Sequence, residues 1–380
     1  MKSTLFILKV KLAKTMTNVN NHSSKKKVAI LIENDVEDAE FQVPYNGLKQ
    51  AGMDVVVLGS RMNEAYKGKR GKLSMRPDGT TTEAIAAEFD AVIIPGGVAP
   101  DKMRCNPNTV RFVTEAIAQN KIVAAVCHGP QVLIEGDLLK GKKATGFKAI
   151  RKDMVNAGAN YLDEPLVIDN NLITSRQPGD LAIFTTAILS RLGYGGKDVG
   201  LPDERDTNAD WWKLADAWGG STKGEIVKAL NTALAGEKYS LEALQKYAEK
   251  ESDNAITSVF QDTIGNKKRH IEYLETRLNQ LGEKPSLAAN IANQYAKVKA
   301  AMTGSDDIFQ LRSALGDAQT GIGDIANLIP SLTDPISTAI FTEIHKDLVR
   351  SEHRLVELYR ARLGNAVKPA QPTTSPSVAM

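Results

Sequence analysis

The hydrophobic periodicity of the chain changes once along its 380 residues, and this change limits the folds available to it. Up to about residue 194, apolar and largely β-branched runs alternate with stretches of helical spacing. The four clearest runs are Val28–Ile32, Asp54–Leu58, Ala91–Ile94 and Ile122–Val126. Strands that are apolar on both faces are typical of a parallel sheet covered by helices on both sides. From Gly224 onward the apolar residues follow the helical period and strand signals are absent. We therefore expect an α/β sandwich followed by an all-α bundle.

Two folded domains fit a chain of this length, because a single hydrophobic core stops growing beyond about 250–300 residues. We expect a mostly parallel α/β domain at residues 26–194 and a bundle of four amphipathic helices at residues 224–365. Residues 1–25, in which translation starts at either Met1 or Met16, are expected to be a disordered leader. Residues 366–380 are rich in Pro, Ser and Thr and are expected to be a disordered tail.

The segment between the two expected domains, residues 195–223, is a Trp-rich linker. It holds all three tryptophans of the chain, Trp211, Trp212 and Trp218. A linker rarely exposes so much apolar surface. The sequence therefore predicts a short amphipathic helix docked on one of the domains.

Charge and cysteine content exclude several classes of protein. The chain has 48 basic and 45 acidic residues, but seven lysines and no acid lie in residues 1–27, so the remainder is mildly acidic. Such a body lacks the basic surface of a nucleic-acid-binding protein. No apolar run approaches the roughly 20 residues of a membrane-spanning helix. The two cysteines, Cys105 and Cys127, form no disulfide framework and fit a reducing compartment. We expect a cytoplasmic protein with no nucleic-acid and no membrane partner.

Cys127 is the strongest candidate for a chemically active residue. In the segment IVAAVCHGP, a buried strand runs directly into Cys-His-Gly-Pro and then into a helix. This places Cys127 in the position of a nucleophile elbow, where the helix dipole and unpaired N–H groups favour the thiolate. A free cysteine is more often a small buried apolar residue, but the tight turn and the adjacent His128 favour a functional role. Cys105, in a polar loop, is expected to be structural.

Further polar groups are expected beside Cys127, because the carboxyl ends of parallel strands meet at one edge of a sheet. Carboxylates crowd the exit from the first strand, at Glu33, Asp35, Glu37, Asp38 and Glu40. A thiolate nucleophile needs a base or an orienting carboxylate, but spacing alone does not separate that residue from a solvated helix-cap carboxylate.

A Pro-Gly-Gly turn follows the strand Ala91–Ile94. The backbone N–H groups of Gly96 and Gly97 are expected to be free there and to face developing negative charge. A bare turn is the alternative interpretation of this motif.

Together these motifs resemble the PfpI family of intracellular proteases and deglycases, which belongs to the superfamily of the parkinsonism-associated deglycase and is class I glutamine amidotransferase-like. The resemblance covers residues 26–194 and rests on ENDVEDAEFQVP, IIPGGVAPDKMR, AVCHGPQVLI and KATGFKAIRKDMVNAGANYL. It implies a flavodoxin-like sandwich, no cofactor, and a homo-oligomer whose active site is completed across a subunit interface.

The resemblance also implies a role for each matching residue. Cys127 is the nucleophile, Glu40 is the carboxylic acid hydrogen-bonded to it, and His128 is the base. Asp101 would orient His128 from a neighbouring subunit, although the family more often has Glu at that position. The backbone at Gly96, Gly97 and His128 would form the oxyanion hole.

The motifs indicate the type of chemistry more directly than they indicate the substrate. Members of the family are described as proteases, glyoxalases, deglycases and chaperones. A thiolate beside a protonated Glu40 suits a small reactive aldehyde, because the carboxyl group can donate a proton to the hemithioacetal and accept one from it. We expect a stress-protective enzyme acting on small dicarbonyls or glycated proteins.

Three alternatives are an intracellular cysteine peptidase, a redox-sensing chaperone that uses oxidation of Cys127, and a scaffold whose bundle binds a partner. A peptidase needs a groove for an extended peptide, of which the sequence gives no sign. Retention of the set Cys127, His128, Asp101 and Glu40 favours the dicarbonyl enzyme over a sensor, because sensing alone needs no His–Asp pair.

Residues from about 224 to 364 resemble a bacterial ferritin-like four-helix family, through LAGEKYSLEAL, NKKRHIEYLETRLNQLG, ALGDAQTGIGD and RSEHRLVELYRARLG. A di-iron bundle of this kind needs one Glu from each of two helices and Glu-x-x-His from each of the other two. The corresponding residues here are Glu237, Asp317, Lys267-x-x-His270 and Arg350-x-x-His353.

Cations at two bridging positions would repel a metal and remove the ligands that neutralise its charge. We therefore expect a metal-free bundle in which Lys267 and Arg350 pair with Glu237 and Asp317. The alternative is that these are ordinary surface residues.

Overall fold

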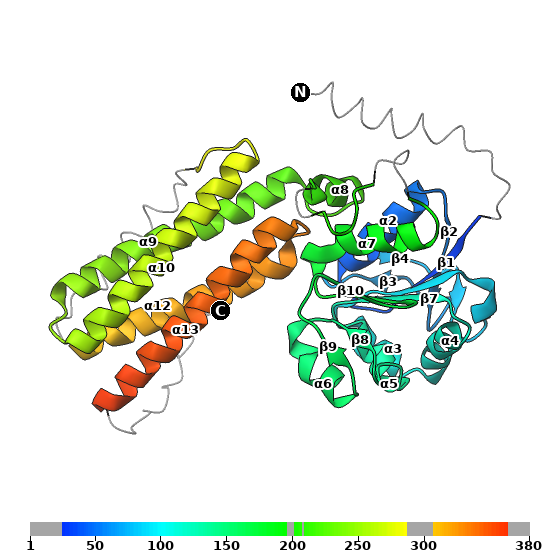
Figure 1. Ribbon diagram of the computed structural model, residues 1–380, viewed down its shortest axis with the longest axis horizontal. Coiled ribbons are helices and arrows are strands. Elements are labelled where there is room, and N and C mark those ends of the chain that lie inside the picture. Colours follow the sequence, from blue (N-terminus) through cyan, green and yellow to red (C-terminus); the bar gives the residue numbers. More distant parts are fainter. Residues whose placement is uncertain (1–24, 196–200, 207–208, 287–306, 364–380) are drawn as a thin grey trace, which may run out of the picture. The chain divides into compact units, whose positions relative to one another are not determined.

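The computed structural model describes residues 25–195, 201–206, 209–286 and 307–363 (Figure 1). The described chain forms two compact units. The first contains the residues up to Ile226 together with Ile329–Thr338, and the second contains Val227–Leu328 and the residues from Ala339 onward. The leader at residues 1–25 and the tail at residues 366–380 fall almost wholly outside the described residues.

The first unit is built on a seven-stranded sheet in the order β10-β11-β7-β6-β1-β2-β5. All neighbouring strands are parallel except the antiparallel hairpin β10–β11. The strands are β1 (Lys27–Leu31), β2 (Asp54–Gly59), β5 (Gly79–Thr80), β6 (Ala91–Ile94), β7 (Ile122–Val126), β10 (Leu166–Asp169) and β11 (Leu172–Ser175). The four strands expected from buried apolar runs are β1, β2, β6 and β7. Because β1, β6 and β7 are parallel neighbours, their carboxyl ends meet at one edge of the sheet.

Helices cover both faces of this sheet, as Figure 1 shows for α2 and α7 on one face and α3, α4 and α5 on the other. Their bounds are α2 (Asp38–Gln50), α3 (Ala99–Arg104), α4 (Pro107–Ala118), α5 (Pro130–Glu135), α6 (Arg151–Asn156) and α7 (Leu181–Arg191). Local signals fix several ends. Helix α2 has acidic residues in its first turn and is followed by Gly52 in the left-handed region. Helix α4 begins at a proline preceded by Asn106, whose side chain accepts a hydrogen bond from the N–H of Asn108.

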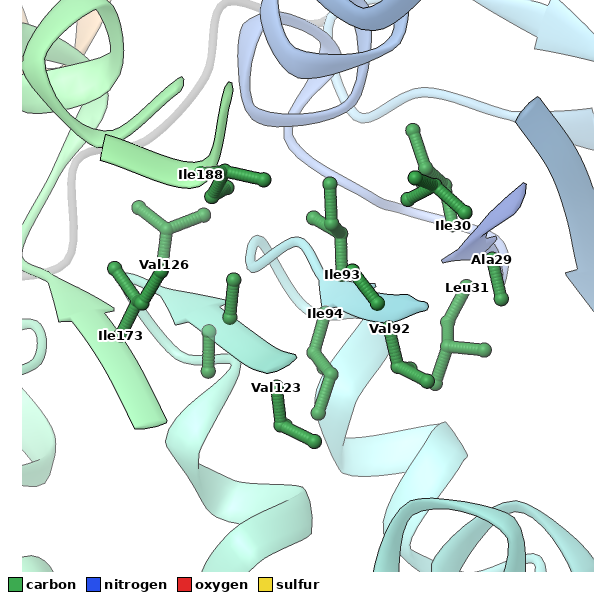
Figure 2. Packing of buried hydrophobic residues seen from close by; sticks show 14 of the residues in the cluster. Ala29, Ile30, Leu31, Val92, Ile93, Ile94, Val123, Val126, Ile173 and Ile188 are labelled. Carbon is green, nitrogen blue, oxygen red and sulfur yellow. The ribbon is translucent and has the colours of Figure 1, made fainter. Parts of the chain in front are cut away.

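The core of the first unit lies on both faces of the central strands. In Figure 2, Ile30, Ile93 and Val126 point to the face of the sheet on which Ile188 of α7 lies, whereas Leu31, Ile94 and Val123 point to the opposite face. All these side chains are essentially inaccessible to solvent. Continuous apolar runs therefore became strands covered on both sides, and the expected α/β sandwich is confirmed.

Very short strands escaped the sequence analysis. Two two-stranded ribbons, β3 (Tyr66–Lys67) with β4 (Ser74–Met75) and β8 (Lys143–Ala144) with β9 (Asn160–Tyr161), lie outside the main sheet. Each strand has two residues, too few to show an alternating pattern. The loop of the β3–β4 ribbon pairs with Val36, just after β1, through Gly68.

The Trp-rich segment contains a short helix, α8 (Trp211–Ala217), as expected. Trp218 joins the main core of the first unit, and Trp211 packs with Ala182 and Ala215. The carbonyl of Trp218 accepts a hydrogen bond from Asn46 of α2 at 2.9 Å. Trp211 and Trp218 are thus buried against the α/β unit, whereas Trp212 is partly exposed.

The second unit is helical, with α9 (Lys223–Lys250), α10 (Asn254–Gln280), α12 (Asp307–Leu328) and α13 (Pro335–Leu363) supplying its long elements. An apolar cluster joins all four, with Leu244, Phe260, Leu311 and Leu355 among its members. Asp253 caps α10 by accepting hydrogen bonds from the N–H groups of Ala255 and Ile256. The expected all-α bundle is confirmed, while its helical connection at residues 287–306 lies outside the described residues.

One segment expected within the bundle packs with the first unit. Ile329–Thr338 includes the single 3-10 turn Ile329–Ser331 that follows α12 and the start of α13. Thr333 exchanges two hydrogen bonds with Ser221, at 2.7 and 3.0 Å, and the carbonyl of Pro330 accepts one from Arg70 at 3.0 Å. Apolar periodicity does not reveal such polar contacts. Within the described residues, no helix has the length and apolarity needed to span a membrane.

Candidate active site

Cys127 lies at the end of β7 in a strained turn. Its φ angle is 61°, in the left-handed region that non-glycine residues rarely adopt. The Cys127 N–H donates to the carbonyl of Ser175 on β11 at 3.0 Å, so the strand pairing continues up to the cysteine itself. At Gly129, a Cβ atom would lie 2.4 Å from the carbonyl oxygen of Ile94, which explains the glycine there. The chain therefore turns as a nucleophile elbow does, with the thiol at the turn.

Glu40 extends from the first turn of α2 to Cys127. Its Oε2 accepts a hydrogen bond from the Gly96 N–H at 2.9 Å, and its Oε1 is buried with no hydrogen-bond partner in the described part of the chain. Burial, with a smaller contribution from Glu37, raises the pKa of Glu40 to about 8. A buried carboxyl group of this kind can hold a proton at neutral pH and donate it.

The expected thiolate-favouring effect of a helix N-terminus does not dominate at Cys127. Burial, followed by the charge of the adjacent Glu40, raises the pKa of the Cys127 thiol well above its ordinary value. Helix α5 is only six residues long, so its dipole is small. Only the backbone N–H groups of Gly97 and His128 oppose the rise. Cys127 and Glu40 are therefore a coupled pair, whose two protons are released in steps that belong to the pair rather than to either residue.

His128 contacts the thiol directly. Its Nδ1 lies 3.3 Å from Cys127 Sγ, and its ring packs against Phe147 with centroids 5.0 Å apart. Burial and the nearby Lys69 lower the pKa of His128, while Asp101 acts in the opposite direction. A neutral imidazole beside the thiol can accept its proton.

Asp101 does not contact His128 within one chain. This carboxylate, on α3, accepts a hydrogen bond from Gln131 at 3.3 Å, and it influences His128 only through its charge. Orientation of His128 by Asp101 from a neighbouring subunit stays a prediction.

The expected pair of free N–H groups at the Pro-Gly-Gly turn is corrected in part. The Gly96 N–H is engaged by Glu40, so it is not free for an oxyanion. A Cβ at Gly96 would lie 2.5 Å from Glu40 Oε2 and 2.8 Å from Cys127 Cβ, so only glycine fits between them. The N–H groups of Gly97 and His128 are the ones that face the sulfur.

Only the tertiary structure separates Glu40 from the other four carboxylates after β1. Glu33 accepts a hydrogen bond from Ser60 at 2.5 Å, and Asp35 pairs with Lys102 at 2.6 Å. These two carboxylates therefore have partners away from the cysteine.

The remaining two carboxylates hold the β3–β4 loop. Glu37 pairs with Arg70 at 2.5 Å, and the two oxygens of Asp38 accept from the N–H groups of Arg70 and Leu73, both at 2.7 Å. Sequence analysis missed this loop as a neighbour of the site. Its basic sequence YKGKRGK, just after a strand, was the available signal.

The second unit contains a buried ionic network. Lys267 on α10 pairs with Glu237 on α9 at 2.8 Å, as expected from the sequence. The other oxygen of Glu237 lies 2.8 Å from His270 Nδ1, and His270 Nε2 lies 3.1 Å from Asp347 on α13. Although burial opposes it, Lys267 and His270 hold the pKa of Glu237 below its usual range.

The expected pairing of Arg350 with Asp317 is wrong. Arg350 is exposed and pairs with Asp347 one turn earlier in α13, at 3.2 Å. Asp317 instead accepts a hydrogen bond from Tyr247 at 3.3 Å, and burial raises its pKa. Sequence analysis missed Asp347, although its spacing of three residues before Arg350 was visible.

The di-iron positions do not fit a metal. Lys267 places an ammonium group where a bridging carboxylate would be needed, and His353 is exposed and pairs with Glu357 at 3.1 Å. In the described chain, no three His, Cys, Asp or Glu side chains come together in a metal-binding arrangement. Glu237, Lys267 and Asp317 line a cavity of about 860 Å³ in this unit.

The parallel sheet, the strained cysteine at the end of β7 and the buried glutamate beside it define a class of protein. Residues 26–191 match the model of the DJ-1/PfpI family, and the chain belongs to that family. Residues 225–327 match a domain of unknown function, DUF2383, and this C-terminal domain is ferritin-like.

Particular relatives match one or both parts. A two-domain protein containing DJ-1/ThiJ/PfpI-like and ferritin-like domains, from Anabaena variabilis ATCC 29413, has a crystal structure that is 76% identical with a TM-score of 0.86. The match covers 92% of this chain and 99% of that one. The putative cysteine protease YraA of Bacillus subtilis is 41% identical over 44% of this chain and 98% of its own length. Protein/nucleic acid deglycase 2 of Escherichia coli is 40% identical over the same shares of each chain.

Proposed function

We propose that the protein is a cofactor-free cysteine enzyme of the cytoplasm that converts small reactive dicarbonyls, or their adducts on proteins, as a protection against carbonyl stress. The observation that carries this proposal is the pairing of Cys127 with Glu40, a buried carboxyl group whose pKa is raised to about 8. A carboxylic acid adjacent to a thiol supplies both proton donation and proton removal at a carbonyl centre.

Each residue has a chemical task in this proposal. His128 accepts the thiol proton, and the sulfur of Cys127 attacks the aldehyde carbon of methylglyoxal. The carbonyl π bond breaks, and its oxygen takes the proton of Glu40 to give a hemithioacetal. Meanwhile the N–H groups of Gly97 and His128 stabilise the developing oxyanion.

The remaining steps move two protons within the substrate and consume one water. The Glu40 carboxylate removes the proton from the former aldehyde carbon and returns it to the neighbouring carbon. The hydroxyl proton of the former aldehyde passes to the ketone oxygen, so the ketone becomes an alcohol and the former aldehyde carbon becomes the thioester carbonyl. The product is a lactoyl thioester on Cys127. Water then attacks the thioester, the carbon–sulfur bond breaks, and lactate and the free thiol result. No electrons leave the substrate, so no external oxidant is required.

The names of two relatives indicate two different activities. The Escherichia coli relative is called a protein/nucleic acid deglycase and the Bacillus subtilis relative a putative cysteine protease. The burial of the site, in which Cys127 is only 7% exposed, favours a small substrate over an extended peptide. Peptidase activity is therefore the second candidate.

Purified protein incubated with methylglyoxal tests the proposal. We expect lactate to form with the natural chain and with Cys105→Ser, whose cysteine is exposed, and to be lost with Cys127→Ser. A peptidase would instead release peptides from casein in a Cys127-dependent manner. Absence of lactate from the natural chain, with the fold intact by circular dichroism, would refute the dicarbonyl reaction.

A further inference from the structure

We propose that Lys69 is the anion-recognition residue of the Cys127 site, so that the site favours electrophiles carrying a carboxylate or phosphate next to the reacting carbon. This inference deepens the proposed function and rests on it for the nature of the substrate. The electrostatic part concerns the thiol alone and can be tested without turnover.

The β3–β4 loop that carries Lys69 is fixed in place by α2. Both oxygens of the buried Asp38 are used by this loop, through the N–H groups of Arg70 and Leu73. At Gly68, a Cβ atom would lie 2.4 Å from the Asp38 carboxyl carbon, so the loop packs directly on that carboxylate. Lys69 therefore extends from an anchored backbone rather than from a free loop.

The same loop is joined through one residue to the Pro-Gly-Gly turn that contains Gly97. Val36 forms a parallel bridge to Gly68 and an antiparallel bridge to Gly97. The Lys69 N–H donates to the carbonyl of Val36 at 2.8 Å. Lys69 and Gly97 thus lie on opposite sides of Val36, and the N–H of Gly97 faces the Cys127 sulfur. This juxtaposition brings the base of the lysine side chain close to the mouth of the site.

Neighbouring cations around this mouth are already neutralised. Arg70 pairs with Glu37, and Lys102 pairs with Asp35. Lys69 is exposed, and within the described residues no carboxylate forms an ion pair with it. Its charge lowers the pKa of both Glu40 and His128, in agreement with the short backbone path from Gly68 through Val36 to Gly97.

The charges around Cys127 favour the binding of one anion. Burial raises the pKa of Glu40 to about 8, which favours its uncharged acid form at neutral pH. Burial also lowers the pKa of His128, which favours the neutral imidazole. The charge of Asp101 acts on His128 from α3. An incoming carboxylate or phosphate would therefore find an unpaired ammonium group at Lys69, with Asp101 as the opposing charge.

Alkylation of Cys127 by a matched pair of reagents tests the inference. Iodoacetate and iodoacetamide have the same reacting carbon, but only iodoacetate carries a carboxylate. In a Cys105→Ser background, we expect Lys69→Met to lower the ratio of the iodoacetate rate to the iodoacetamide rate by about 3- to 100-fold, the range for one unit charge at about 6 Å between effective dielectric constants of about 80 and about 20. Lys69→Arg should keep the ratio within about twofold, because it keeps the charge.

Lys67→Met is the matched control, since Lys67 is an exposed lysine of the same ribbon. An unchanged ratio in Lys69→Met, or an equal fall in Lys67→Met, would overturn the inference. Equal slowing of both reagents in Lys69→Met would also overturn it, because a change in thiol ionisation alone has that effect. Loss of the predicted ratio with lactate formation intact would refute anion recognition but not the proposed function. A changed ratio without lactate formation would support anion recognition by Lys69 and refute the proposed dicarbonyl reaction.

Discussion

Glu40 illustrates how much the environment of a single residue decides. Five carboxylates follow β1 within eight positions, and four of them bond to a serine, to basic side chains or to backbone N–H groups. Only Glu40 is fully buried beside the cysteine, where it has one unsatisfied oxygen. Burial converts an ordinary acid into a group that holds its proton near neutral pH.

At the residue scale we predict that Glu40→Gln separates thiol reactivity from turnover. Burial raises the pKa of Glu40 to about 8, so the natural pair should release its first proton near pH 8 and its second at higher pH. Glutamine does not titrate and carries no charge, and therefore the thiol should ionise in one step at a lower pH than it does beside ionised Glu40. Turnover should fall by about 10²- to 10⁴-fold, because the general acid is lost.

The measurement is the pH dependence of iodoacetamide labelling alongside that of kcat/KM. Glu33→Gln is the control, because Glu33 bonds to Ser60 rather than to the cysteine. Full turnover in Glu40→Gln, with an unchanged pH profile, would contradict the role given to Glu40.

At the scale of elements, helices α9, α10 and α13 are joined by ionic contacts where a ferritin-like bundle would hold metal. Lys267 is almost fully buried and pairs with Glu237, which also contacts His270. Buried ion pairs are costly to break, because the remaining partner is left charged and desolvated. That the bundle is metal-free stays a prediction, and about two iron atoms per bundle in elemental analysis would contradict it.

We predict that Lys267→Met destabilises the second unit by about 3–5 kcal/mol, the range for removal of one partner of a buried pair. Lys268→Met, at the exposed neighbouring position, should change the free energy of unfolding by less than about 0.5 kcal/mol. Urea unfolding followed by helical circular dichroism provides the comparison. Equal effects of the two substitutions would show that the ionic network does not stabilise the helices.

The pH dependence of the same network has a defined sign. Lys267 and His270 hold the pKa of Glu237 below its ordinary value of 4.5. The stabilisation from Glu237 is therefore complete above about pH 4.5 and is lost as the pH falls through the lowered folded-state pKa. In Lys267→Met, this acid-labile contribution should be reduced.

At the scale of the whole molecule, the position of Asp101 bears on whether one chain forms a complete site. Asp101 is exposed, and its hydrogen bond is with Gln131 rather than His128. The site as described therefore contains Cys127, Glu40 and His128, with Asp101 nearby. Completion of the site by a second copy of the chain is consistent with this arrangement and stays a prediction.

We predict that mixing two inactive variants, Cys127→Ser and Asp101→Ala, restores part of the lactate-forming activity after subunit exchange. A mixed oligomer contains some sites with an intact cysteine from one chain and an intact carboxylate from the other. Exchange is followed with differently tagged chains. Demonstrated exchange without recovered activity would refute a shared site, and full activity of Asp101→Ala alone would remove the role assigned to Asp101.

The sequence by itself determined the class of fold and the position of the strained turn that carries Cys127. Runs such as Ile122–Val126 are apolar at every position, so they become strands buried on both faces. Cys-His-Gly-Pro directly after one of them fixes a tight turn at Cys127. These signals are local, because periodicity and turn chemistry depend on residues adjacent in the chain.

Only the tertiary structure decided which polar groups meet. It placed Glu40 against Cys127 and used the Gly96 N–H for that carboxylate instead of an oxyanion. It also paired Arg350 with Asp347 in an ion pair, rather than with Asp317. Each of these outcomes depends on burial and on contacts between elements far apart in sequence, and so does the raised pKa of the Cys127 thiol. A one-dimensional pattern identifies which residues carry charge, but the free energy of that charge depends on the solvent and partners that folding leaves around it.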